Sequence, residues 1–211
     1  MNEEAKITLS ALEMELVNDT EWIFTKQLII KKVSHILGLL HQDYKQIIAN
    51  QRAFLPELLL RPGGKISKGE NYKGLPYMIL DYPAVFYKEK IFAIRTMFWW
   101  GNFFSISLHL SGENFKSISN AANAISFLKE KGFSVSVNEE EWQHHFHPSN
   151  FTSINELKSE EINKLFQKNF LKIAKKISLT DWDLATQFLT QTFVEIIEFI
   201  KVSFPNGEKG L

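Results

Sequence analysis

The chain has 211 residues, equal numbers of basic and acidic residues, and no cysteine. This length accommodates one domain, and the 45% apolar content, with 18 Phe and 5 Trp residues, supplies a sizeable core. The balanced charge argues against nucleic-acid binding, and the absence of cysteine excludes disulfides and thiol chemistry. We therefore predict a single domain over residues 1–211.

The N-terminal sequence, MNEEAKITL, is acidic where a signal peptide would be basic and then apolar. No apolar stretch reaches the length of about 18 residues that indicates a transmembrane helix. These two observations predict a cytoplasmic protein without a membrane partner.

Apolar residues at helical spacing predict a long helix over residues 20–49, with Thr20 as its N-cap, and a shorter helix over residues 6–17 before it. Residues 61–74, RPGGKISKGENYKG, contain four glycines and show no apolar periodicity. We therefore predict a loop without secondary structure in this segment. Loops of this length in compact proteins often close over a ligand, although a mobile surface loop has the same composition.

Three features in the middle of the chain predict strands. The sequence YMILDY, which lies between two prolines at positions 76 and 83, is typical of a short strand. Residues 91–111 are typical of a β-hairpin in which Gly101-Asn102 forms a two-residue turn of type II′. The strict alternation of residues 133–137 predicts a further strand.

The predicted turn also predicts the two faces of the hairpin. A two-residue turn pairs Trp100 with Phe103 and places Arg95 beside Leu108 on an otherwise apolar face, which we expect to lie against the helices. The opposite face then carries aromatic residues across from hydroxyl groups and His109. Such a mixed face is typical either of a pocket wall or of a surface that is solvated or covered by helices.

Helical periodicity predicts three more helices, over residues 114–131, 162–177 and 182–204. The first ends at Gly132, which is a favoured residue after a helix. The last is apolar on most sides, so we expect it to be buried within the domain or at a subunit interface. Residues 139–153, between the last predicted strand and these C-terminal helices, show no regular pattern.

The order of these elements, helices followed by strands followed by helices, predicts an α+β fold. We expect a small antiparallel sheet around the 91–111 hairpin, covered by the N- and C-terminal helices.

A buried Arg95 requires a charged partner, because an unpaired guanidinium in a core is costly. Asp81, at the end of the preceding strand, is the first candidate, and Glu113 and Glu70 come next. The pair is either a purely structural ion pair or part of a site in which the planar fork of Arg95 holds an anionic ligand.

The most metal-like cluster in the chain is Glu141, His144, His145 and His147. In a helical conformation Glu141, His144 and His147 share a face, whereas in an extended one His145 and His147 do. Either arrangement supplies two or three zinc ligands, and a distant residue such as His109 has to complete the set. No zinc-binding spacing motif is present, so we predict that the purified protein holds no tight metal.

The sequence contains neither a phosphate-binding loop nor a recognisable catalytic nucleophile. The GGKIS sequence departs from a phosphate-binding loop, because Leu59 stands where that motif requires glycine and Ile66 where it requires Ser or Thr. No nucleophile occurs in a recognisable catalytic context.

These observations favour non-catalytic binding of a small anionic or polar ligand, or of a protein partner. The predicted site combines the hairpin with the 61–74 loop and consists of Lys65, Lys68, Asp81, Arg95, Trp100, Phe103 and His109. One alternative is a metal-dependent or acid–base enzyme that uses His144, His145 and His147 with His109. Another is a structural homodimer formed through the last helix. We predict no cofactor, and the identity of the ligand or partner stays open.

Overall fold

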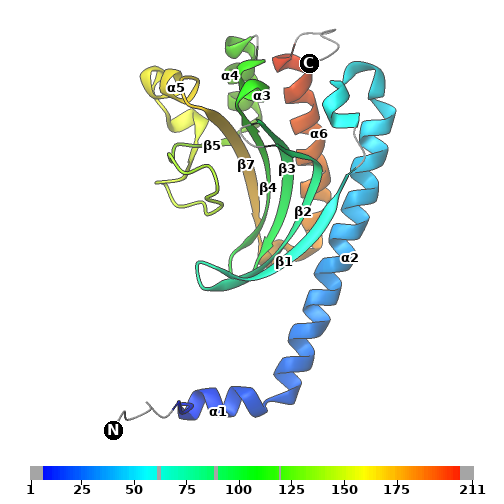
Figure 1. Ribbon diagram of the computed structural model, residues 1–211, viewed down its shortest axis with the longest axis vertical. Helices are drawn as coiled ribbons and strands as arrows, with labels where there is room; N and C mark the ends of the chain where they lie inside the picture. Colours follow the sequence, from blue (N-terminus) through cyan, green and yellow to red (C-terminus); the bar gives the residue numbers. More distant parts are fainter. Residues whose placement is uncertain (1–6, 61–62, 88–89, 119, 205–211) are drawn as a thin grey trace.

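The computed structural model describes residues 7–60, 63–87, 90–118 and 120–204. Seven strands within these residues form one antiparallel sheet in the order β1–β2–β3–β4–β7–β5–β6. Helices α2 and α6 lie along one face of the sheet, and the irregular segment before β6 lies over the other face (Figure 1). The predicted α+β class with terminal helices is confirmed, but the sheet is larger than the small one expected.

The strands are β1 (Lys65–Tyr72), β2 (Leu75–Tyr87), β3 (Lys90–Trp99), β4 (Phe103–Ser111), β5 (Ser134–Ser136), β6 (Phe151–Ser153) and β7 (Phe170–Ser178). The α-helices are α1 (Ala11–Asn18), α2 (Thr20–Asn50), α3 (Glu113–Lys116), α4 (Ala121–Lys131), α5 (Ser159–Leu165) and α6 (Ala185–Ser203). Four short 3-10 helices cover Arg52–Phe54, Glu57–Leu60, Ile154–Glu156 and Leu179–Leu184. No helix within the described ranges is both long and apolar enough to cross a membrane.

The long N-terminal helix is confirmed as α2. Its N-cap is Asp19, one residue before the expected Thr20, because the Asp19 carboxylate accepts a hydrogen bond of 2.8 Å from the Trp22 amide. The preceding helix α1 is shorter than predicted and begins in a capping box formed by Ser10 and Glu13. The part of the expected 6–17 helix at residue 6 lies outside the described residues.

The predicted 61–74 loop is wrong, since β1 occupies most of it; residues 61–62 lie outside the described part of the chain. As an edge strand, β1 pairs only with β2 and is largely exposed, so its sequence carries no apolar alternation. Gly69 fits this strand because a Cβ there would collide with the Tyr77 ring on β2.

The hairpin is present, but its predicted register is wrong by one residue. Trp99 pairs with Phe103, so three residues form the turn, and Gly101 takes a left-handed backbone with φ of 67°. A shift of one residue exchanges the faces of one strand relative to the other. Arg95 consequently pairs with Ser107 and lies on the face away from α2 and α6.

The helix predicted over residues 162–177 is half wrong. Helix α5 ends at Leu165, and β7 follows as an inner strand between β4 and β5. Residues 171 and 173 of β7 are buried in the main core, and their neighbours project from the opposite face. A short apolar segment fits both helical and strand spacing, and pairing on both sides decides in favour of the strand.

Two smaller departures occur around the predicted helix over residues 114–131. It is divided into α3 and α4, and Gly132 ends α4 in the left-handed conformation as expected. Strand β5 is confirmed within residues 133–137, whereas β6 lies in a segment expected to be irregular.

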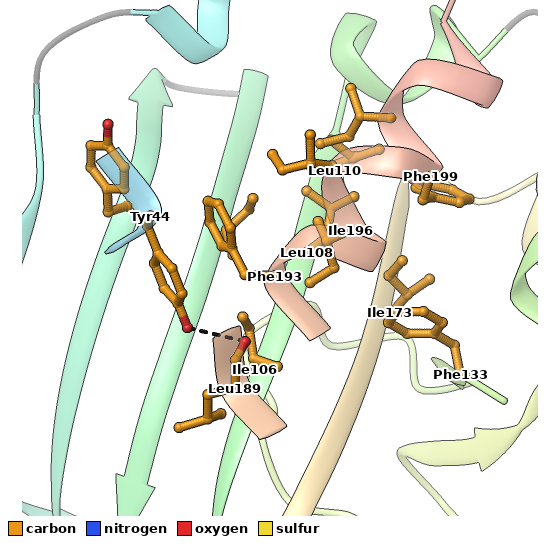
Figure 2. Close-up of a cluster of buried hydrophobic side chains, with 14 of the residues drawn as sticks. Tyr44, Ile106, Leu108, Leu110, Phe133, Ile173, Leu189, Phe193, Ile196 and Phe199 are labelled. Atoms are coloured by element: carbon orange, nitrogen blue, oxygen red, sulfur yellow. Dashed lines mark hydrogen bonds between the residues drawn. The ribbon is translucent and has the colours of Figure 1, made fainter. Parts of the chain in front are cut away.

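Helix α6 packs its apolar side chains between α2 and the sheet (Figure 2). The Tyr44 ring of α2 stacks on Phe193 of α6 with centroids 3.8 Å apart, and its hydroxyl donates to the Leu189 carbonyl at 3.4 Å. Thr96 of β3 lies 3.1 Å from the same hydroxyl. The apolar character of α6 is thus explained by burial within the chain itself, and a homodimer through this helix stays a prediction.

Candidate functional site

Polar side chains gather on the sheet face that α2 and α6 leave uncovered. Alternate residues of a strand share a face, and neighbouring strands place Asp81 beside Arg95 and His109 beside Lys172. All four residues lie on inner strands, β2, β3, β4 and β7. The inner strands therefore bring four ionisable side chains to one surface.

Arg95 forms a bidentate ion pair with Asp81, and this contact was predicted. The Arg95 Nε and Nη2 atoms lie 2.7 Å and 2.9 Å from the two carboxylate oxygens of Asp81. The expected location on the helix-covered face is wrong, because the register differs. Since Asp81 already occupies the fork of Arg95, only Nη1 is directed elsewhere, at 3.1 Å from His144 Nε2.

Residues 138–150, called here the covering segment, lie over this polar face (Figure 1). The Tyr72 hydroxyl accepts hydrogen bonds from the amides of His144 and His145, at 2.7 Å and 3.0 Å. Lys168 donates to the carbonyls of Val137 and Asn138, both at 2.8 Å. The segment is irregular in backbone, yet hydrogen bonds from Tyr72 of β1 and from Lys168, in the turn before β7, hold it in place.

Lys172 is the most unusual residue of the site, because only 1% of it is exposed. Its Nζ atom lies 3.1 Å from the Glu141 carbonyl, 2.6 Å from the Gln143 carbonyl and 3.1 Å from His144 Nδ1. All three partners belong to the covering segment. A lysine in this position is rarely buried unless every hydrogen bond of its amino group is satisfied.

The hydrogen bonds around His144 indicate which form of Lys172 is present. A guanidinium only donates, so His144 Nε2 accepts from Arg95 and the neutral ring carries its proton on Nδ1. That proton is donated to Lys172 Nζ, which accepts it only as a free amine. The two remaining amine protons match the two carbonyls, so a free amine satisfies every partner.

The electrostatic environment also favours the free amine of Lys172. Burial, together with the charge of Arg95, lowers the pKa of Lys172 to about 7, while Glu141 opposes the shift. Burial and the charges of Lys172 and Arg95 hold the pKa of His144 well below its ordinary value. Near neutral pH His144 is therefore uncharged, and the lowered pKa of Lys172 makes the free amine indicated by its hydrogen bonds accessible.

His109 makes the second link to the covering segment. Its Nε2 atom lies 3.2 Å from a carboxylate oxygen of Glu141, and the Trp142 and Phe170 rings flank it. Burial, Lys172 and Arg95 lower the pKa of His109 to about 3. The neutral ring thus donates its Nε2 proton to the Glu141 carboxylate.

The covering segment fits closely on the face beneath it. The space between Arg95, Ser105, Ser107 and the His144 ring is too small to hold a water molecule. Among the described residues, Gln143 Oε1 is a buried oxygen without a hydrogen-bond partner in this region. A ligand therefore reaches the polar face only when the covering segment moves.

The structure brings together some of the predicted site residues and separates others. Asp81, Arg95, His109, Glu141 and His144 meet around Lys172, and Phe103 lies on the same face near the turn. Of the other predicted residues, Lys65, Lys68, Trp100, His145 and His147 lie outside this group.

The reasons differ from residue to residue. Both lysines lie on the edge strand β1. Lys65 is opposite Asp81 of β2, on the polar face, whereas Lys68 is opposite Met78, on the face that the helices cover. Trp100 lies in the turn, against Phe98 of the same core. In the described part of the chain, no group of three or more His, Asp or Glu side chains is arranged to hold a metal ion.

Sequence reasoning missed Lys172, because it was placed in a predicted helix. The alternation of residues 170–178, FLKIAKKIS, is the signal that would have identified a strand with one polar face. Comparisons of the chain with protein-family models, curated proteins and solved structures each found no match. The function of the site is therefore argued from its own chemistry.

Proposed function

We propose that the chain binds a small molecule bearing a carboxylate on the polar face of its sheet, beneath the covering segment. The observation that carries this proposal is that the basic side chains of the face already bind oxygen acceptors, which the covering segment supplies. The Glu141 carboxylate accepts from His109, and two backbone carbonyls accept from Lys172. A carboxylate ligand offers the same acceptors, so it replaces these contacts when the segment opens.

The protonation state of Lys172 gives this proposal a specific electrostatic consequence. In the closed protein the pKa of Lys172 is lowered to about 7. An anion beside Nζ favours the ammonium form, so binding is accompanied by proton uptake above pH 7. The affinity for a carboxylate is thus expected to fall as the pH rises from 7 towards 10.

The test uses acetate, succinate and pyruvate as probes, with the corresponding neutral amides as controls. Titration calorimetry of the full chain in buffers of different ionisation enthalpy is expected to reveal binding and proton uptake for a carboxylate but not for its amide. Replacing Lys172→Met removes a charge-assisted hydrogen bond worth about 1.5–3 kcal/mol, so affinity drops by about tenfold or more.

Lys176→Met is the matched control, since Lys176 lies on the same strand and face but is exposed. It is expected to bind the probe as the unmodified chain does. Binding that does not distinguish a carboxylate from its amide, or that survives Lys172→Met unchanged, would overturn the proposal.

A second candidate function, nucleophilic catalysis by the Lys172 amine with His144 as its acid–base partner, is favoured by the hydrogen bond between the two side chains. A free amine on a buried lysine is both a base and a nucleophile. If this candidate is correct, borohydride added with pyruvate fixes a reduced imine on Lys172, which is detected as a mass increase of the peptide that contains it. Without imine formation the same reaction leaves that peptide unchanged, and reversible binding remains.

A further inference from the structure

The N-terminal arm, residues 11–32, projects away from the rest of the protein. It consists of α1 and the first part of α2, which extend beyond the end of the sheet (Figure 1). Among the described residues 7–32 none is buried, and the first buried residue of α2 is Val33. The arm contacts the rest of the protein mainly near its end, where Ile29 and Ile30 pack against the core and the charged atoms of Lys26 and Glu70 are 3.8 Å apart.

Large apolar side chains cover this arm. Phe24 is 65% exposed and Leu28 56% exposed, on the side away from the core-facing residues of α2. On the other side lies a groove of about 550 Å3, with an apolar lining of Leu16, Val17, Trp22, Ile23 and Ile30. The groove continues the apolar face of α2 that begins in the core at Val33.

Two physical arguments indicate that another surface covers the arm. A helix as short as α1, or as the part of α2 in the arm, is only marginally stable in water by itself, since most helical stability in proteins comes from packing. Large apolar side chains exposed in this way mark an interaction site.

The distribution of charge indicates which surface that is. Within the arm every acidic residue precedes every basic one along the chain. The acidic residues are Glu13, Glu15, Asp19 and Glu21, and the basic residues are Lys26, Lys31 and Lys32. An antiparallel second arm places the acidic end of one copy beside the basic end of the other, whereas a parallel arm places like charges together.

We propose that the arm is the interface of a homodimer, in which the arms of two copies pack antiparallel about a twofold axis. Such an interface is self-complementary, as twofold symmetry requires. The axis passes close to Phe24, which lies between the acidic and basic ends and is the most exposed large apolar side chain of α2 among the described residues. Phe24 and Leu28 of each copy pack against the same two residues of the other.

Sedimentation of the full chain tests the oligomeric state directly. The unmodified chain is expected to be a dimer, and Phe24→Glu is expected to be a folded monomer. Phe54→Glu is the matched control, because Phe54 is similarly exposed at 67% but lies outside the arm. An unmodified chain that sediments as a monomer at every concentration, or Phe24→Glu that remains a dimer, overturns the proposal.

Charge reversal tests the antiparallel arrangement. Lys26→Glu with Lys32→Glu is expected to weaken the dimer, and so is Glu15→Lys with Glu21→Lys. The variant with all four changes is expected to recover dimerisation, since it restores opposite charges across the interface. Failure of the fourfold variant to recover overturns the antiparallel pairing.

Cross-linking provides a readout that does not depend on stability, since the chain has no cysteine of its own. In the Ile23→Cys variant, the cysteines of the two copies lie near the axis and are expected to form a disulfide with each other on oxidation. Glu13→Cys, far from the axis, is expected to form none with itself. Equal cross-linking of both variants, or a monomer that sediments with anionic lipid vesicles instead, overturns the homodimer.

Discussion

Asp81 and Arg95 form an ion pair that is almost enclosed, with 13% and 16% of their side chains exposed. The two groups leave water on folding, and their mutual attraction offsets that cost only while both are present. His144 accepts from the remaining nitrogen of the guanidinium, which links the pair to the covering segment. The pair therefore determines the geometry of the site more than it adds to net stability.

Replacing Arg95→Met is expected to lower the free energy of unfolding by about 3–5 kcal/mol, because it leaves the Asp81 carboxylate buried without its partner. The double variant Asp81→Leu with Arg95→Met removes both charges and is expected to recover most of that loss. Urea denaturation of the unmodified chain, both single variants and the double variant measures the difference. A neutral effect of Arg95→Met would mean that the pair is solvated in solution.

The covering segment is an element without regular structure that is held by hydrogen bonds from its neighbours. Tyr72 lies at the end of the edge strand β1, and its hydroxyl is the acceptor for two consecutive amides of the segment. On the opposite side, Lys172 donates to the Gln143 carbonyl at 2.6 Å, and within the segment the fully buried Asn150 donates to the His145 carbonyl at 2.6 Å. Such a segment opens locally at a smaller cost than the sheet beneath it.

Replacing Tyr72→Phe removes the acceptor of both amides while keeping the aromatic ring. Each lost hydrogen bond is worth about 1 kcal/mol, so we expect the amides of His144 and His145 to exchange with deuterium about tenfold faster or more. Tyr77→Phe, the same substitution on the neighbouring strand, is the control. Unchanged exchange in Tyr72→Phe would show that the hydroxyl does not hold the segment.

At the scale of the whole molecule, the sheet separates two different environments. One face is apolar and packs against α2 and α6, as the rings around Tyr44 and Phe193 show (Figure 2). The other carries a smaller aromatic cluster around Trp99 and Phe103, next to the buried cationic and imidazole groups. The second face makes overall stability depend on pH, because its buried bases resist protonation.

His109 gives this dependence a sign that experiment can check. In the unfolded chain its pKa is about 6.5, whereas burial lowers the pKa in the folded protein to about 3. Below pH 6.5 the unfolded state therefore binds a proton that the folded state does not, so the free energy of unfolding falls as the pH falls towards 3. A single group contributes at most about 1.4 kcal/mol per pH unit to this slope.

The His109→Gln variant keeps a donor for Glu141 but does not titrate. Urea denaturation between about pH 6 and 5 is expected to show a shallower fall of the unfolding free energy than in the unmodified chain. His144, Lys172, Arg95 and Glu141 face the same site and are present in both proteins, so they cancel in the comparison. Equal slopes would contradict a neutral, buried His109.

Much of the fold follows from local patterns. The periodicity of α2 and α6, the end of α4 at Gly132 and the hairpin around Gly101 are all determined within short stretches of chain. These patterns depend on neighbouring residues only, so the sequence alone was sufficient for them. The pairing of Asp81 with Arg95 was also predictable, since a buried guanidinium requires a nearby carboxylate.

The tertiary structure decided what depends on distant partners. Strand β7 forms because β4 and β5 pair with it on both sides, and β1 forms because β2 offers it an edge. A turn one residue longer than expected moved Arg95 to the other face, because strand faces alternate residue by residue. Lys172 and His144 are separated by 28 positions in the chain, so only the folded sheet brings the amine and the imidazole together.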